Sequence, residues 1–181
     1  FLEEPRLAEI SSRRTFCAGS GIGSGVCTGD SGGGFFIKVS NVYYLRGIVS
    51  ASLVTESQCD VFNFAVFTNV LKFSDWINSK TSQERNYEEC GVMSSSTGLI
   101  HGGKFSTLRD FPWVALIIDN QTYYESGALV SHKHVVTSAT SVSFWEKKKK
   151  KYLKVALNRI KVHLGAFQER DSRQVFDPVE I

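Results

Sequence analysis

A serine between glycines lies early in the chain, in the run Gly29, Asp30, Ser31, Gly32 and Gly33. A serine hydroxyl becomes an effective nucleophile only when a base takes its proton and backbone N–H groups receive the oxyanion that forms. Glycines on both sides of the serine let the backbone come close to a substrate carbonyl. The run therefore predicts nucleophilic chemistry at Ser31.

The same run also fits the Gly-x-Ser-x-Gly pattern of the α/β-hydrolase nucleophile elbow, which needs a helix directly after the serine. Gly32, Gly33 and Gly34 would destabilise a first helical turn, and residues 35–39 are mostly aromatic or β-branched. A β-strand is therefore expected after the serine, which excludes the elbow.

The elements around Ser31 follow a β pattern. Short strands alternate with glycine turns through residues 1–80, which end in an amphipathic helix with Val70, Phe73, Trp76 and Ile77 on one face. From residue 81 to residue 98 the composition changes to Ser, Glu, Asn and Gly, which is typical of a linker.

Five ordered segments of residues 1–80 resemble the second barrel and the C-terminal helix of a chymotrypsin-like serine protease. They are Phe-Cys-Ala-Gly at 16–19, Cys-Thr-Gly-Asp-Ser-Gly-Gly at 27–33, Tyr-Leu-Arg-Gly-Ile-Val-Ser at 44–50, Ala-Val-Phe-Thr-Asn-Val at 65–70 and Phe-Ser-Asp-Trp-Ile at 73–77. The resemblance implies that Ser31 is the nucleophile and that the N–H groups of Gly29 and Ser31 are the oxyanion donors. It also implies that the Asp30 carboxylate pairs with a freed N-terminal amine, which holds the oxyanion loop in shape.

Residues 99–181 resemble the first barrel of another domain of the same family. The matching segments are Leu-Ile-His-Gly-Gly at 99–103, Phe-Pro-Trp-Val-Ala-Leu at 111–116, Ser-Gly-Ala-Leu-Val-Ser at 126–131, Val-Val-Thr-Ser-Ala-Thr at 135–140 and Val-His-Leu-Gly at 162–165. The expected fold is therefore all-β, with two antiparallel β-barrel halves in the order second barrel (1–80), linker (81–98), first barrel (99–181), and a short helix ending the first unit.

This order is expected for a fragment that spans the end of one protease domain and the start of a second one. Docking of the two halves within one chain, as a permuted double barrel, is a further alternative. The Cys-Gly pair at 90–91 makes the resemblance closest to clip-domain serine proteases and their inactive homologues.

The second unit is expected to be degenerate. The family's Thr-Ala-Ala-His-Cys segment appears as Thr-Ser-Ala-Thr-Ser at 137–141, so Thr140 stands where the resemblance places the general base. Ser141 replaces the family's cysteine, and Glu125 stands where its disulfide partner is expected. Leu99 precedes Ile100, where the family usually has a basic residue at the activation point.

Two functions remain in view. The first is a serine-type endopeptidase in the parent protein, with this chain inactive alone, because loss of the base lowers turnover by about a millionfold in subtilisin. The second is a non-catalytic homologue that acts as a binding scaffold or cofactor in a secreted proteolytic cascade. The expected partners are protein or peptide substrates and other cascade proteases.

The resemblance also implies the lining of a specificity pocket. Gly25 stands where trypsin-like members carry an aspartate, and the walls would carry Ser50, Ser52 and Ala65. Without a buried carboxylate, an Arg or Lys side chain would lose its partner while still being desolvated. A small or apolar side chain is therefore expected at the cleaved position.

The four cysteines contain no Cys-x-x-Cys pair, which argues against a zinc or thioredoxin-type site and fits an oxidised, secreted chain. The resemblance implies a bridge between Cys27 and Cys59, with the partners of Cys17 and Cys90 outside the chain. No metal and no cofactor are expected.

Bulk composition narrows the partners further. The 181 residues are 42% hydrophobic and 22% charged, with a net charge of +3, so the chain is globular and gives no reason to expect nucleic-acid binding. No apolar run is long enough to span a bilayer, and the acidic start does not resemble a signal peptide. One basic run, made up of Lys147, Lys148, Lys149, Lys150 and Lys151, is either a solvated loop or a contact for an anionic polysaccharide or microbial surface.

Three weaker motifs are set aside. Gly98 to Lys104 resembles a phosphate-binding loop, but Phe105 stands where the magnesium-binding Ser or Thr belongs. The glycines at 19, 21, 23 and 25 do not open a helix, which excludes a dinucleotide site. His132 and His134 have no third metal ligand nearby in the sequence.

Overall fold

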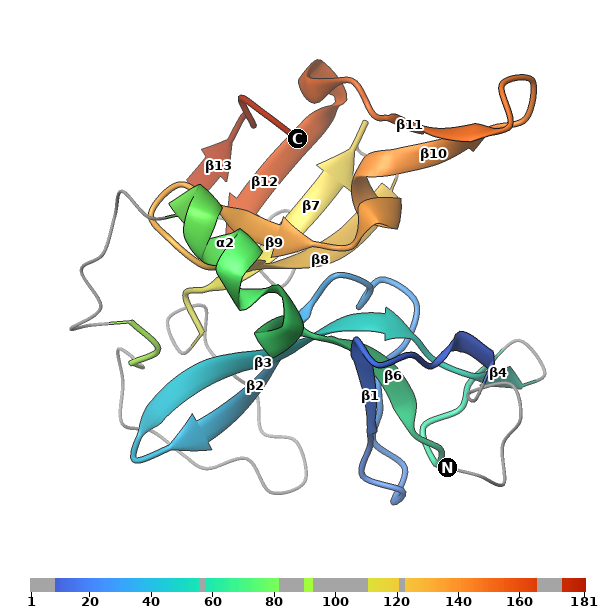
Figure 1. Ribbon diagram of the computed structural model, residues 1–181, viewed down its shortest axis with the longest axis vertical. Coiled ribbons are helices and arrows are strands. Elements are labelled where there is room, and N and C mark those ends of the chain that lie inside the picture. Colours follow the sequence, from blue (N-terminus) through green and yellow to red (C-terminus); the bar gives the residue numbers. More distant parts are fainter. Residues whose placement is uncertain (1–8, 56–57, 82–89, 93–110, 121–122, 166–173) are drawn as a thin grey trace.

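The computed structural model describes residues 9–55, 58–81, 90–92, 111–120, 123–165 and 174–181. Its two main antiparallel sheets come one from the first half (described residues 9–81) and one from the second half (described residues 111–181), and each half also has a two-stranded sheet. The two sheets lie side by side, the first in blue and green and the second in yellow to red (Figure 1). The predominance of antiparallel strands, with one short α-helix among the described residues, confirms the expected all-β fold.

The first half forms a four-stranded sheet in the order β1-β6-β3-β2. Its strands are β1 (Thr15–Ala18), β2 (Gly34–Val39), β3 (Val42–Ala51) and β6 (Ala65–Asn69), and a two-stranded ladder joins β4 (Val54–Thr55) to β5 (Gln58–Cys59). Ser40 and Asn41 both have positive φ angles, 48° and 67°, which suit the tight turn between β2 and β3. A strand thus follows the serine segment, as expected from residues 35–39.

One core cluster of the first half contains Val49, Ala65 and Phe67, which are 3–6% exposed, and a second contains Leu53 and Val66. The rings of Phe16 and Phe35 pack on Phe67, with centroids 5.5 and 4.9 Å away. Aromatic pairs at such distances stabilise a core beyond their buried area.

The C-terminal helix of the first half begins as a 3₁₀ turn, η1 (Val70–Phe73), and continues as α2 (Ser74–Thr81). Val70, Phe73 and Ile77 are partly buried, as the amphipathic pattern predicts. Trp76 differs from this pattern, because it is 58% exposed.

The second half forms a five-stranded sheet in the order β13-β12-β7-β8-β9. Its strands are β7 (Val114–Asp119), β8 (Tyr123–Leu129), β9 (Val135–Thr137), β12 (Ile160–Leu164) and β13 (Gln174–Phe176). A separate hairpin joins β10 (Ser143–Glu146) to β11 (Lys151–Lys154), and two 3₁₀ turns, η2 (Ala139–Val142) and η3 (Leu157–Arg159), lie between the strands. The core of this half contains Ile117, Val155 and Ile160.

The two halves dock against each other within the one chain, the alternative that the sequence left open. Trp113 is 8% exposed. Its ring centroid lies 5.7 Å from that of Phe36 in β2 and 5.5 Å from that of Tyr43 in β3. Phe111 contacts both Tyr43 and Trp113. An aromatic cluster therefore joins the β2–β3 hairpin to the start of β7.

Part of the expected linker also packs on the first half. The Tyr43 N–H donates to the carbonyl oxygen of Gly91 at 2.8 Å. A Cβ at Gly91 would lie 2.2 Å from the Tyr43 carbonyl oxygen, and its φ of +73° favours glycine in any case. Only glycine fits this contact.

No helix in the described ranges is long and apolar enough to cross a membrane. The expected activation point at Leu99 and Ile100 lies outside the described residues, as does the glycine-lysine motif at 98–104.

Candidate active site

Residues 27–33, which we call the nucleophile loop after the role expected for Ser31, connect the disulfide of the first half to β2. Two hydrogen bonds lie within the loop. The Asp30 N–H donates to the Cys27 carbonyl oxygen at 3.1 Å, and the Gly33 N–H donates to the Asp30 carbonyl oxygen at 2.9 Å. Two further hydrogen bonds join the loop to β3. The Gly32 N–H donates to the Val49 carbonyl oxygen at 3.0 Å, and the Val49 N–H donates to the Gly33 carbonyl oxygen at 2.8 Å. Strand β3 therefore fixes the backbone on the C-terminal side of Ser31.

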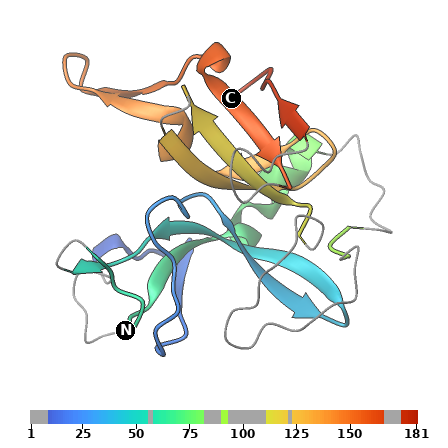
Figure 2. The same ribbon diagram turned by 180° about the vertical axis from the view of Figure 1, so that it is seen from behind.

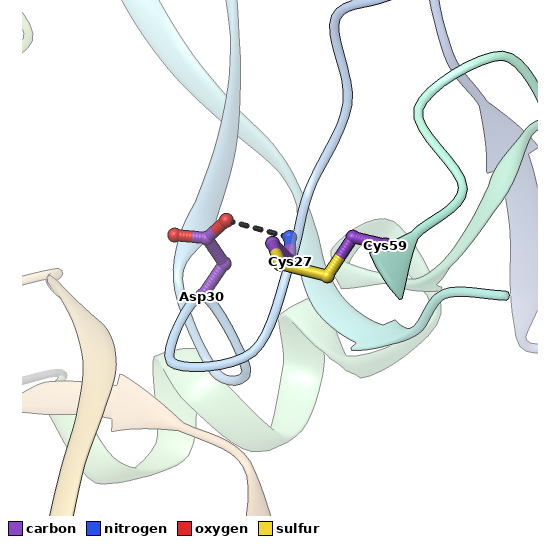
Figure 3. Close-up of a disulfide and its surroundings, with 3 residues drawn as sticks. All are labelled: Cys27, Asp30 and Cys59. Carbon is purple, nitrogen blue, oxygen red and sulfur yellow. Dashed lines mark hydrogen bonds between the residues drawn. A yellow bond between two sulfur atoms is a disulfide. The ribbon is translucent and has the colours of Figure 1, made fainter. Parts of the chain in front are cut away.

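The disulfide between Cys27 and Cys59 confirms the expected pairing, with the two Cα atoms 5.4 Å apart (Figure 3). It fastens the start of the nucleophile loop to β5. Cys17 lies half-buried in β1, with its sulfur 4.0 Å from the Ser11 hydroxyl, and Cys90 is exposed.

The Asp30 side chain is exposed, and its carboxylate accepts a hydrogen bond from the Cys27 N–H at 2.8 Å (Figure 3). This contact lies within the nucleophile loop itself. It gives the carboxylate a local amide partner in place of the N-terminal amine that the family resemblance implies.

Strand β8 of the second half lies directly against the nucleophile loop. The Ser126 N–H donates to the Ser31 carbonyl oxygen at 3.0 Å, and the Ser126 hydroxyl donates to the Gly29 carbonyl oxygen at 2.9 Å. The Thr137 hydroxyl donates to the Ser126 carbonyl oxygen at 2.7 Å, which connects β9 to the same contact. The loop that carries Ser31 is thus held from both halves.

Gly32 is the tightest point of this contact. A Cβ there would lie 2.2 Å from the Thr137 hydroxyl oxygen and 2.4 Å from the Ser126 carbonyl oxygen. Its φ is +80°, a conformation that other residues rarely adopt. The two halves can approach this closely only because position 32 has no side chain.

Glu125 places a carboxyl group beside the Ser31 side chain. It is only 9% exposed, and burial raises the pKa of its carboxyl group, while a hydrogen bond from the Ser31 side chain offsets part of this effect. Its Oε2 atom is buried without a hydrogen-bond partner among the described residues. The Ser31 hydroxyl therefore faces a buried acid.

The Glu125–Ser31 pair did not follow from the sequence. Glu125 was noted only as the replacement for a disulfide cysteine, and the two residues are 94 positions apart. The available signal was that Glu125 stands where the resemblance expects the disulfide partner of position 141, which follows the general-base position at Thr140.

Linked hydroxyl groups lie at residues 138–141, where the resemblance of the second half leads us to expect a histidine and a cysteine. The Ser138 hydroxyl contacts the Thr140 hydroxyl at 2.8 Å and the Ser141 hydroxyl at 2.7 Å. Thr140 is exposed, whereas Ser141 is 6% exposed and also accepts from the Thr137 hydroxyl at 3.2 Å. None of these hydroxyl groups can serve as a base near neutral pH.

The described histidines lie elsewhere. His134 shares a 2.7 Å hydrogen bond with the Ser131 hydroxyl, and His132 is exposed on the same turn. His163 is buried in β12, and β7 separates that strand from β8 in the sheet. Within the described residues, no three His, Cys, Asp or Glu side chains gather as a metal site.

The expected pocket residues come from segments that the fold brings together. Gly25 lies against Val61, because a Cβ added at Gly25 would be 3.2 Å from the Val61 Cα atom. The nearby Cys27–Cys59 disulfide joins the same two segments. Ser50 lies at an irregularity in the β3–β6 pairing and is exposed, while Ser52 is half-buried. Ala65 is buried in the core cluster with Val49, so its side chain packs inward.

Comparison with known proteins shows what the first half of the chain is similar to. Residues 5–77, which include Ser31, match the model of the Trypsin family. This part of the chain is therefore similar to trypsin-family proteins, which supports the chymotrypsin-like class expected from the sequence.

Three curated proteins illustrate the similarity. Serine protease gd of Drosophila melanogaster is 33% identical over 96 residues, which cover 44% of this chain and 18% of that protein. Spermosin of Halocynthia roretzi is 35% identical over 75 residues, covering 41% of this chain and 19% of its own length. Vitamin K-dependent protein C of Oryctolagus cuniculus is 33% identical over 82 residues, covering 45% and 17%. The chain thus spans less than a fifth of each of these relatives.

Proposed function

We propose that residues 1–80 are the nucleophile-bearing half of a serine endopeptidase domain, with Ser31 as the nucleophile in the complete protein. The trypsin-family match over residues 5–77 and the similarity to proteases such as spermosin support this assignment. The hydrogen bonds that fix the nucleophile loop to β3 are consistent with it. In this proposal Asp30 controls the loop, and the N–H groups of Gly29 and Ser31 receive the oxyanion.

The chain alone is proposed to be inactive. The observation that carries this proposal is the partner of the Ser31 side chain, which is the buried carboxyl group of Glu125. A serine triad uses an imidazole as its base, whereas the group beside Ser31 is a carboxyl group and the Thr140 hydroxyl cannot take a proton near neutral pH. Without a suitable base, the oxyanion donors leave only about 10³ to 10⁴ of rate enhancement over water.

The alternative is a non-catalytic protease homologue that serves as a scaffold or cofactor in a proteolytic cascade. The hydroxyl network around Ser138 favours this for the second half, which we propose to be a degenerate domain (residues 99–181) joined by the linker at 81–98. There, the positions of a base and of a cystine carry Thr140 and Ser141.

The proposed partners follow from the family. They are protein or peptide substrates and, in a cascade, other proteases. We also propose that the protein is secreted, because the Cys27–Cys59 disulfide requires an oxidising compartment to persist. The residues Gly25, Ser50, Ser52 and Ala65 are proposed to admit a small or apolar side chain.

A fluorophosphonate probe tests the proposal, because it labels a serine only when that serine is activated. The 181-residue chain and its Ser31→Ala variant are compared with an active trypsin-family protease, with circular dichroism as the check on folding. Labelling no faster than that of the alanine variant is expected. Rapid labelling that Ser31→Ala abolishes would overturn the claim of inactivity and leave the nucleophile assignment intact, whereas rapid labelling at another serine would overturn that assignment.

A further inference from the structure

The β10–β11 hairpin stands apart from the two main sheets. Its strands pair only with each other, from Ser143 opposite Lys154 to Glu146 opposite Lys151. It projects from the body of the second half in both views (Figures 1 and 2). We call residues 143–154 the lysine hairpin.

The tip of the lysine hairpin is a dense cluster of positive charge. The turn is made of Lys147, Lys148, Lys149 and Lys150, and Lys151 begins the return strand; all five are exposed. The ion pairs found among the described residues join other residues, Arg159 with Asp119 and Lys161 with Asp177. The neighbouring acid, Glu146, accepts a hydrogen bond from the backbone N–H of Lys148 at 3.1 Å.

Lys150 occupies a backbone conformation that favours other residues. Its φ is +48°, in the left-handed region where glycine or asparagine is usual. A lysine here adds a charge to the tip despite an unfavourable backbone and four like-charged neighbours. Conformational strain of this kind is concentrated at functional positions.

The stem of the hairpin adds an exposed aromatic pair. Trp145 and Tyr152 are directly opposite in the ladder, so their side chains lie on the same face. Their rings form an edge-on pair with centroids 5.1 Å apart, and they remain 50% and 63% exposed. Phe144, also exposed, belongs to the opposite face of the hairpin because it pairs with Leu153.

We propose that the lysine hairpin is a binding site for an anionic polysaccharide of the heparin type. The acidic groups of the chain would lie against the lysines of the tip, and a sugar ring would pack its C–H face on the Trp145–Tyr152 pair. Such a ligand alternates fixed charge with an apolar ring face along one chain. The hairpin offers the complementary features in the same order, with ammonium groups at the tip and aromatic rings on the stem.

The arrangement fits other polyanions less well. A hairpin that inserts into a membrane needs apolar side chains at its tip, whereas here the tip is charged and the aromatic rings lie behind it. Single-stranded nucleic acid binds along a basic groove with rings free to stack on successive bases. Here the two rings pack edge-on against each other, and the net charge of the whole chain is only +3.

The proposal is tested by measuring heparin binding to the 181-residue chain at a series of salt concentrations. Protein fluorescence is the readout of binding. The pair Lys148→Gln with Lys149→Gln is compared with the pair Lys72→Gln and Lys80→Gln, two exposed lysines of the first half with the same total charge change. We expect about a tenfold weaker affinity and a shallower salt dependence for the hairpin pair, and less than about a twofold change for the control. Equal losses in both pairs would show bulk charge attraction only and overturn the proposal.

The aromatic half of the site has its own comparison. Trp145→Ala is expected to weaken heparin binding by roughly fivefold to tenfold with the salt dependence unchanged, and Phe144→Ala, on the opposite face, should leave it unaltered. Trp145→Tyr keeps a ring if alanine disturbs the hairpin, and it should retain binding. Equal effects of Trp145→Ala and Phe144→Ala would contradict the proposed ring contact.

Competing ligands separate the source of the anion. Desulfated heparin, single-stranded DNA of similar length and phosphatidylserine vesicles are each expected to bind more weakly than heparin. Tighter binding of the DNA or of the vesicles would replace the polysaccharide by that partner. Binding to heparin that persists unchanged above about 0.5 M salt would overturn the electrostatic contact with the lysines.

Discussion

The Ser126 backbone N–H donates a hydrogen bond to the Ser31 carbonyl oxygen at 3.0 Å, so strand β8 of the second half is bonded directly to the nucleophile loop of the first half. The adjacent Glu125 faces the Ser31 side chain from the same strand. The state of the nucleophile loop and the docking of the two halves are therefore physically linked. A substitution in the nucleophile loop should therefore affect the docking of the halves, and a substitution in β8 should affect the conformation of the loop.

Gly32→Ala should destabilise the protein strongly. The new Cβ would lie 2.2 Å from the Thr137 hydroxyl oxygen, in addition to a left-handed φ of +80° that costs about 1–2 kcal/mol for other residues. Gly21→Ala is the matched control, because Gly21 has a φ of +66° with only one atom within 4 Å, the Phe62 carbonyl oxygen at 3.9 Å. Urea unfolding should show a larger loss for Gly32→Ala, and equal losses would contradict the close contact between the halves.

Glu125→Gln should stabilise the folded chain at neutral pH. Burial raises the pKa of Glu125 in the folded state, so the folded protein binds this proton more tightly than the unfolded chain does. Its contribution is most favourable below the unfolded pKa, about 4.3, and is lost as pH rises through the raised folded pKa. The advantage of the glutamine should therefore grow with pH across this window.

The measurement is urea unfolding at a series of pH values from acidic to neutral. Glu9→Gln, at an exposed site, is the control and should change stability little at any pH. An advantage of Glu125→Gln that is constant with pH, or is largest in acid, would show that the carboxyl group is not disfavoured in its charged form.

Loss of the Cys27–Cys59 bridge should cost about 3–4 kcal/mol in the loop-entropy account of disulfides. Replacing both cysteines with serine should lower the urea midpoint by the corresponding amount, and reduction of the unaltered chain should reproduce the loss. Cys17→Ser serves as the control and should have a much smaller effect. A double variant as stable as the unaltered chain would mean that the β-sheet alone holds the nucleophile loop.

Trp113→Ala should weaken the docking of the two halves. Removing a buried indole costs about 3–5 kcal/mol, and this ring contacts both Phe36 and Tyr43 of the first half. Trp76→Ala removes the same ring from a site that is 58% exposed, and it should have little effect. Limited proteolysis should cut Trp113→Ala faster than Trp76→Ala, and equal resistance of the two variants would argue against an aromatic joint between the halves.

The fold class and the disulfide could be predicted from the sequence because both depend on local pattern and on a long ordered resemblance. The glycines after Ser31 and the β-branched run beyond them excluded a helix, and the strand β2 begins at Gly34. The burial of Trp76 was expected from helical periodicity alone. Periodicity gives the face on which a side chain lies, but not whether another element covers that face.

The contacts between the halves lay beyond sequence reasoning. The Glu125–Ser31 pair and the fit of Gly32 against Thr137 depend on how two sheets approach in space, and no spacing in the chain encodes that approach. The exposed Asp30 with its local amide partner is a similar case. The lysine run was visible in the sequence, but its neighbouring aromatic pair emerged only from the register of Trp145 opposite Tyr152.

The hydrogen bond from Tyr43 to Gly91 fixes one point of the connection between the two sheets. Gly91 lies a third of the way from Thr81 to Phe111, so this contact divides the connection into two shorter spans, each with its own entropy of closure. Anchoring a connection at a point along its length raises the effective concentration of one module at the other without any new contact between them. A single residue without a side chain thereby helps keep intramolecular assembly ahead of association between separate molecules.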